Sequence, residues 1–124
     1  GGGGAQPVLQ LLIQPMLDDR CTILSSDAVE DHWAWNYIKN GWAWTAYLGS
    51  QLSDASPFAA PARAASLTNL PPALISAADL DHFLGEDISF ARALAASEVP
   101  VELHVYAGAP HGFEAMAPEA EISI

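Results

Sequence analysis

The sequence predicts an α/β domain built from about three parallel strands with flanking helices. Three short apolar segments, residues 8–13, 73–77 and 101–106, have the length and composition of strands. Between the second and the third lies a segment, 86–98, whose apolar residues recur at helical spacing. The order strand, helix, strand indicates a right-handed parallel crossover, so we expect the two later strands to share one sheet.

The three predicted strands differ in the positions that they should take in the sheet. Residues 8–13 (VLQLLI) are apolar on both alternations and stop at Pro15, as in a strand that is covered on both faces. Residues 73–77 (ALISA) are small and apolar throughout, which predicts a central strand. Polar and apolar residues alternate in 101–106 (VELHVY), which indicates an edge strand with one wet face.

The helix predicted at 86–98 should pack on the sheet through one apolar face. We expect this face to consist of Ile88, Ala91, Leu94 and Ala95, which follow one another at helical spacing. The first two residues of the segment are acidic, and the helix dipole favours anions at that end.

Residues 31–49 contain all four tryptophans of the chain. We interpret this segment as a buried aromatic helix that packs on the sheet, with Trp35, Ile38 and Trp42 on one face and Gly41 allowing a bend. The alternative is an apolar substrate pocket lined by some of these rings, and both interpretations can hold together.

The charge balance excludes several classes of partner. The chain has four lysine and arginine residues against fifteen carboxylates, a formal net charge of -11, and no basic stripe. Nucleic acid and anionic membrane surfaces are therefore not expected partners. No apolar run approaches the roughly twenty residues that span a bilayer. The single cysteine, Cys21, cannot form an internal disulfide, which favours a reducing, cytoplasmic location.

Two titratable residues follow neighbouring strands of the predicted sheet. Asp81 comes after the second strand, and His111 comes after the third in the stretch GAPHGFE. Catalytic groups in open α/β sheets collect at the carboxyl ends of the strands. A carboxylate that holds an imidazole in one tautomer is the orienting half of a nucleophilic triad. The order Asp then His, with a serine expected upstream, is that of α/β-hydrolases.

Two rival chemistries fit the sequence less well. A metal site would have to gather the acidic and imidazole groups near the two loops, Asp79, Asp81, His82, His104 and His111. No pair of histidines has the HxxxH or HxH spacing that brings two ligands together on one element. Cys21 as a nucleophile lies among acidic neighbours, which raise the pKa of a thiol. We therefore expect neither a metal nor another cofactor.

Most of the chain resembles the carboxyl-terminal half of the hormone-sensitive-lipase-like esterases, the bacterial carboxylesterase branch of the α/β-hydrolase fold. The segments that carry this resemblance are LLIQPMLDDR, NGWAWTAYLG, SPFAAPARAASLTNLPPALISAADLDHFLGEDISFARAL and VPVELHVYAGAPHGFE. The resemblance implies that Asp81 is the triad acid, that His111 is the general base, and that Gly108 and Gly112 shape the loop around it. It also implies which residues border the substrate cleft, namely Leu80, Phe83 and Phe113.

The sequence departs from this family in two motifs and at one position. Family members carry a G-x-S-x-G nucleophile elbow and an H-G-G oxyanion motif, and neither is present here. We therefore expect residues 5–124 to be the carboxyl-terminal part of an α/β-hydrolase domain that lacks the amino-terminal half of its sheet, and residues 1–4 to be a glycine linker or remnant. His82 replaces the usual proline, beside Asp81, where its imidazole can compete for the carboxylate.

The expected function is that of a fragment of a serine carboxylic-ester hydrolase. Such a fragment supplies the aspartate and histidine for an acyl-enzyme mechanism on small esters. The alternative is a non-catalytic half-domain that associates with itself, as a homo-oligomer, or with a companion chain that carries the amino-terminal half. Exposed strand edges, which are templates for pairing, favour this alternative.

Overall fold

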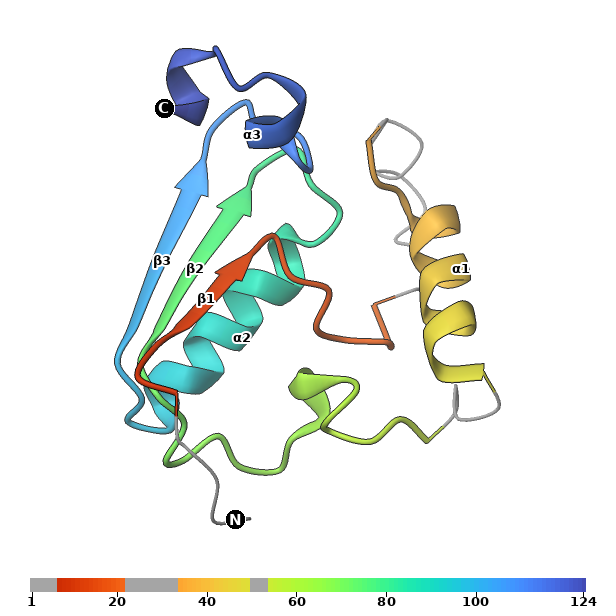
Figure 1. Ribbon diagram of the computed structural model, residues 1–124. Helices are drawn as coiled ribbons and strands as arrows, with labels where there is room; N and C mark the ends of the chain where they lie inside the picture. Colours follow the sequence, from red (N-terminus) through yellow and green to blue (C-terminus); the bar gives the residue numbers. More distant parts are fainter. Residues whose placement is uncertain (1–6, 22–33, 50–53) are drawn as a thin grey trace.

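The computed structural model describes residues 7–21, 34–49 and 54–124. In this part of the chain, strands β1 (Gln10–Ile13), β2 (Ala73–Ala78) and β3 (Val101–Tyr106) form one parallel sheet in the order β1-β2-β3 (Figure 1). The predicted parallel sheet, with its second strand in the centre and its third at an edge, is confirmed. The first strand is shorter than predicted, and the glycine segment 1–4 lies outside the described residues.

Helices accompany the sheet in the predicted order. Helix α2 (Leu84–Ala96) connects β2 to β3 and lies against one face of the sheet (Figure 1). Helix α1 (Tyr37–Leu48) lies to the side of β1, and the short helix α3 (Phe113–Met116) follows β3. Two 3-10 turns, η2 (Pro61–Arg63) and η3 (Glu121–Ser123), complete the described elements. None of the described helices has both the length and the apolar character needed to cross a bilayer.

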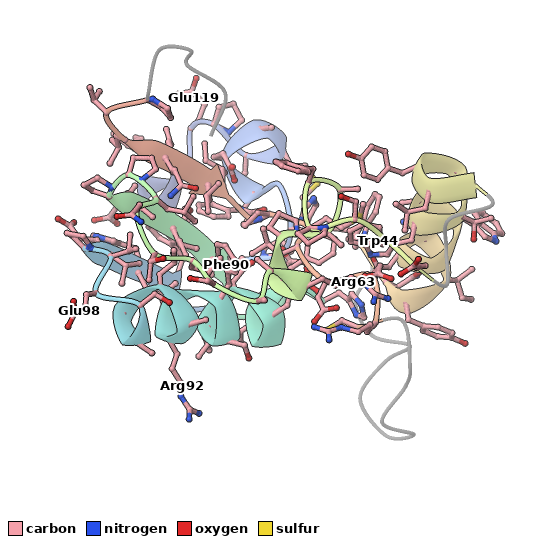
Figure 2. All side chains as sticks on the ribbon, turned by 90° about the horizontal axis from the view of Figure 1, so that it is seen from below. Trp44, Arg63, Phe90, Arg92, Glu98 and Glu119 are labelled. Atoms are coloured by element: carbon pink, nitrogen blue, oxygen red, sulfur yellow. The ribbon has the colours of Figure 1, made fainter. Side chains whose placement is uncertain are left out.

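The main hydrophobic core lies between the sheet and α2. Ile75 of β2 packs there with Phe90 and Leu94 of α2. Figure 2 shows Phe90 on the sheet side of the helix, whereas Arg92 points away from it. The predicted face was wrong in part, because Ile88 is 44% exposed and Ala95 is also exposed. The helix is turned so that the larger Phe90 ring, two residues further on, fills the space against β2.

One face of the sheet remains open in the described part of the chain. Leu11 and Ile13 of β1 are 59% and 53% exposed, because α2 covers the opposite face of the sheet. The prediction that this strand is covered on both faces is therefore wrong for the described residues. The carboxyl-terminal residues Ile122 and Ile124 lie beside this open face and help to line a cavity of about 310 Å³ there.

Helix α1 is amphipathic, but its buried face differs from the predicted one. Asn40, Trp44 and Leu48, which recur every four residues, are buried, whereas Ile38 and Trp42 are 47% and 72% exposed. Trp44 packs with Ala55 and Ala60 of the segment that follows the helix. Figure 2 shows Trp44 between α1 and the rest of the chain. Trp35 precedes the helix and does not share its face, while Trp33 lies outside the described residues.

Candidate active site

The loops that leave β2 and β3 lie side by side at the carboxyl edge of the sheet (Figure 1). They are joined by backbone hydrogen bonds: the N–H of Asp79 donates to the carbonyl of Tyr106 (3.2 Å), and that of Leu80 donates to the carbonyl of Ala109 (3.0 Å). In the second loop, Gly108 and Gly112 have positive φ angles of 76° and 71°, which residues with a side chain rarely adopt. These turns place the residues between them, His111 included, over the first loop.

Asp81 and His111 are in direct contact. The distance between His111 Nδ1 and Asp81 Oδ2 is 2.7 Å, as expected for a charge-assisted hydrogen bond. The other carboxylate oxygen of Asp81 accepts the N–H of Phe83 at 3.2 Å. Since a carboxylate can only accept, Nδ1 is the donor of this hydrogen bond, and in a neutral ring this leaves the lone pair on Nε2. The Asp81 side chain is 1% exposed and that of His111 is 30% exposed, so only the imidazole is open to a reactant.

Asp79 and Asp81 have different hydrogen-bond partners in the His111 loop. Its Oδ1 accepts a hydrogen bond of 2.7 Å from the N–H of Gly108, at the start of the His111 loop. The sequence predicts that Asp81, and not Asp79, contacts the imidazole, and the geometry agrees with that prediction. Asp79 thus holds the backbone of the loop, and Asp81 holds the ring.

Two aromatic rings enclose the imidazole of His111. The Phe83 ring meets it edge-on with a centroid distance of 5.4 Å, and the Trp35 ring lies at 5.5 Å. Phe83 is 1% exposed, so it fills the space below the histidine and restricts the rotation of its ring. The contact between Trp35 and His111 was not predicted, although the tryptophan-rich segment was considered as a pocket wall. Nothing in the local sequence indicates which of the four tryptophans reaches the histidine.

The other residues predicted to border a substrate cleft lie in two different environments. The Leu80 side chain is 53% exposed at the same loop as Asp81. Phe113 is buried with Ala78 and Ala109, and its ring lies 5.2 Å from that of Tyr106. The structure therefore places Phe113 in a small core below the His111 loop, while the Phe83 ring packs against the imidazole ring.

His82 does not compete for Asp81, contrary to what the sequence suggested. Its Nε2 lies 3.1 Å from the carbonyl of Cys21 and 3.1 Å from Nδ2 of Asn40. The side chain of residue 82 leaves the loop in the direction of α1, because Asp81 is already enclosed by His111 and the N–H of Phe83. The carboxylate of Asp81 is thus available to His111.

The described residues do not assemble a metal site. No group of three histidine, cysteine, aspartate or glutamate side chains converges within residues 7–21, 34–49 and 54–124. His104 is on β3 and faces Glu102 at 3.4 Å, and His82 turns toward α1. Cys21 is a free thiol whose pKa is raised to about 12 by burial and by the carboxyls of Glu86 and Asp18, so it is a poor nucleophile.

Two buried carboxyl groups lie at the start of α2, close to the Asp81 loop. Glu86 accepts the N–H of Leu17 at 2.7 Å, and burial raises its pKa to about 7. Asp87 is fully buried, and neither of its oxygens has a hydrogen-bond partner among the described residues. Burial, together with the carboxyls of Glu86 and Asp81, raises the pKa of Asp87 to about 8. The sequence predicted acidic residues at this end of the helix but did not indicate that they are buried inside the fold.

The sequence and the fold of this chain have counterparts in known proteins. Residues 2–115 match the model of a family described as the alpha/beta hydrolase fold. The chain belongs to this family. As an α/β-hydrolase it is 35% identical over 112 residues to the carboxylic ester hydrolase LipN of Mycobacterium tuberculosis, a match that covers 90% of this chain and 30% of LipN. The resemblance to bacterial carboxylesterases and the partial α/β-hydrolase fold, both predicted from the sequence, are confirmed.

Solved structures of esterases have the same arrangement of elements. Esterase LipW from Mycobacterium marinum superposes with a TM-score of 0.81 at 32% identity, covering 94% of this chain and 36% of that protein. A bacterial heroin esterase superposes with a TM-score of 0.81 at 36% identity, covering 94% of this chain and 38% of that protein. This α/β-hydrolase chain thus spans between 30% and 38% of the length of these relatives.

Proposed function

We propose that this chain supplies the acid-base pair of a serine carboxylesterase, with His111 as general base and Asp81 as the acid that orients it. The observation that carries the proposal is the 2.7 Å contact between His111 Nδ1 and Asp81 Oδ2. Nε2 of the same ring makes no hydrogen bond with the described residues. The kinship with LipN and other esterases supports an ester as the substrate class.

The proposed reaction proceeds in two stages, acylation and deacylation of the serine, and each stage transfers a proton to His111 and back. Nε2 of His111 takes the proton of a serine hydroxyl as the serine oxygen attacks the ester carbonyl, and then gives that proton to the departing alcohol. Water repeats the sequence on the acyl-enzyme and releases the carboxylic acid. Asp81 stabilises the imidazolium that forms in each step. The serine and the oxyanion donors have to come from a segment that contains G-x-S-x-G and H-G-G, which this sequence lacks.

The surroundings of the imidazole support roles for further residues in this reaction. Phe83 and Trp35 restrict the ring, so that Nε2 keeps one direction during both transfers. Leu80, exposed on the same loop as Asp81, is available to contact a small ester, and Phe83 and Phe113 stay as further proposed border residues of the cleft. The single cysteine favours a reducing, cytoplasmic location for the enzyme.

A chimera tests the proposed function. Residues 5–124 of this chain replace the matched segment of LipN, and hydrolysis of p-nitrophenyl butyrate is followed by the absorbance of the released phenolate. We expect the chimera to hydrolyse this ester at least about 10³-fold faster than the 124-residue chain alone, because nucleophile and oxyanion donors act together with the base. The chain alone should not exceed free imidazole at equal concentration.

Intact LipN is the positive control for the chimera. A chimera that has the circular dichroism spectrum of LipN and yet hydrolyses no ester would contradict the proposal. Burst-phase hydrolysis by the 124-residue chain alone would contradict the assignment of the nucleophile to another segment.

A second candidate function, self-association, is favoured by the open face of the sheet. Leu11 and Ile13 are more than half exposed on it, and β1 has no strand on its outer side among the described residues. An unpaired edge beside apolar side chains is a template for pairing with another chain. We propose that this edge pairs with a second copy of the chain and so forms a homo-oligomer. The alternative partner is a companion chain that carries the amino-terminal half.

Sedimentation velocity at micromolar concentration tests the self-association. We expect dimers or larger species, and we expect Leu11→Lys to weaken association at least about tenfold, because it removes a buried apolar side chain from the interface. Ile88→Lys is the matched control, since Ile88 is 44% exposed on α2, which covers the opposite face of the sheet. A monomer that unfolds cooperatively at these concentrations would show that this half of the fold needs no partner.

A further inference from the structure

Gln14 has an unusual backbone conformation directly after β1. Its φ angle of 44° lies in the left-handed region, which residues with a β-carbon rarely adopt. The residue is 4% exposed, and its N–H donates to the carbonyl of Ser76 at 2.8 Å. Such a conformation persists only where the surrounding structure imposes it, and residues of this kind concentrate at functional sites.

The side chain of Gln14 reaches across the sheet edge to the His111 loop. Its Oε1 accepts a hydrogen bond from the N–H of Gly112. Its Nε2 donates to Oε2 of Glu114, in the first turn of α3, at 3.0 Å. Both the oxygen and the nitrogen of this buried amide therefore form hydrogen bonds. Both partners lie within three residues of His111, the proposed general base.

The contact with Gly112 acts directly on the backbone of His111. The N–H of Gly112 belongs to the peptide group that also contains the His111 carbonyl, so fixing this N–H fixes the peptide plane that follows His111. Gly112 has a wide range of accessible φ angles, and a bond to its N–H selects one of them. At the other end of the loop, Asp79 holds the N–H of Gly108 in the same way.

We propose that Gln14 is a positioning residue, which holds the His111 loop so that the imidazole stays in contact with Asp81. This inference rests on the proposed function, because it gives Gln14 a role through His111 and not through contact with substrate. The residue directly after β1 thereby stabilises the contact between Asp81 and His111, although both of those residues follow other strands. Without the Gln14 amide, the loop keeps its hydrogen bonds at Gly108 and Ala109 but loses the one at Gly112, and opening at the Gly112 side exposes Nδ1 to water.

The test measures the exchange of the His111 Nδ1 proton with water, by NMR on the 124-residue chain. We expect Gln14→Leu to accelerate this exchange by about fivefold or more, the factor that corresponds to one lost hydrogen bond. Gln10→Leu is the matched control: Gln10 is at the other end of β1 and bonds the carbonyl of Pro71 at 2.8 Å. The double change Gln14→Glu with Glu114→Gln exchanges the two partners, keeps both hydrogen bonds, and should restore slow exchange.

Two outcomes would overturn the positioning role. One is unchanged exchange in Gln14→Leu, and the other is equal acceleration in Gln10→Leu, which would indicate general loosening of the sheet. Because the measurement needs no turnover, it remains decisive if the chimera with LipN proves inactive, and failure of the proposed function is thus distinguished from failure of this inference. In an active chimera, Gln14→Leu should lower kcat about fivefold while KM stays unchanged.

Discussion

Replacing His111 with alanine in the chimera should lower kcat for p-nitrophenyl butyrate by about 10⁴-fold, the largest effect that we expect from any single change. The reason is that no other described side chain occupies the position of Nε2, so the serine proton has no acceptor. His104→Ala is the matched control, since His104 is a histidine on β3 whose imidazole is 54% exposed and lies 3.4 Å from Glu102. Circular dichroism should be nearly unchanged in both variants.

The companion change Asp81→Asn separates orientation from proton transfer. An asparagine amide can donate to Nδ1, which selects the tautomer with the proton on Nε2 and removes the base. We expect a loss of kcat between about 10³-fold and 10⁴-fold with little change in KM. Residual activity above a tenth of the parent chimera in either variant would remove that residue from the catalytic pair.

Replacing Asp87 with asparagine should stabilise the chain at about pH 8. The pKa of Asp87 is raised to about 8 in the folded chain, mainly by burial, whereas an unfolded aspartate has its ordinary, low pKa. Between about pH 4 and pH 8 the unfolded chain has therefore lost a proton that the folded chain retains. The free energy of unfolding falls with rising pH in this window, by up to about 1.4 kcal/mol per pH unit.

Urea denaturation at about pH 5 and about pH 8 measures this effect. We expect Asp87→Asn to raise the free energy of unfolding at the higher pH, on the order of 2 kcal/mol, and to change it little at the lower pH. Part of the decline with pH should remain, because the pKa of Glu86 is also raised, to about 7. Asp54→Asn, at an exposed aspartate, is the control. A wild-type chain that becomes more stable from pH 5 to pH 8 would contradict the prediction.

The sheet and the contact between Asp81 and His111 were predictable, because both follow from local patterns in the sequence. Continuous apolar character distinguished β2 from the alternating β3, and parallel strands necessarily bring the residues after their carboxyl ends together. The contact between Asp81 and His111 follows from that topology. Alternation along a strand does not separate Asp79 from Asp81, since residues two positions apart point the same way, and the choice of Asp81 came from the resemblance to the esterases.

The features that were not predicted depend on packing between distant segments. Spacing alone allowed Ile88 on the buried face of α2, but the choice between it and Phe90 depends on the volume available above β2. The burial of Asp87 was not predicted, because the segments that cover it cannot be identified from the sequence of its own helix. The hydrogen bond between Gln14 and Gly112 joins residues that are 98 positions apart, and no local sequence pattern indicates such a contact.

The short distance along the chain between Asp81 and His111 has a consequence for the order of folding. These residues are 30 positions apart, in the loops that follow the two strands of a single β2-α2-β3 unit, whereas β1 must return to β2 across the whole tryptophan-rich segment. Closing a longer loop costs more conformational entropy, and contacts of low sequence separation form faster. The unit that contains the acid-base pair should therefore assemble first. Pairing of β1 with β2, which brings Gln14 to the His111 loop, should then come later and stabilise a contact between Asp81 and His111 that has already formed.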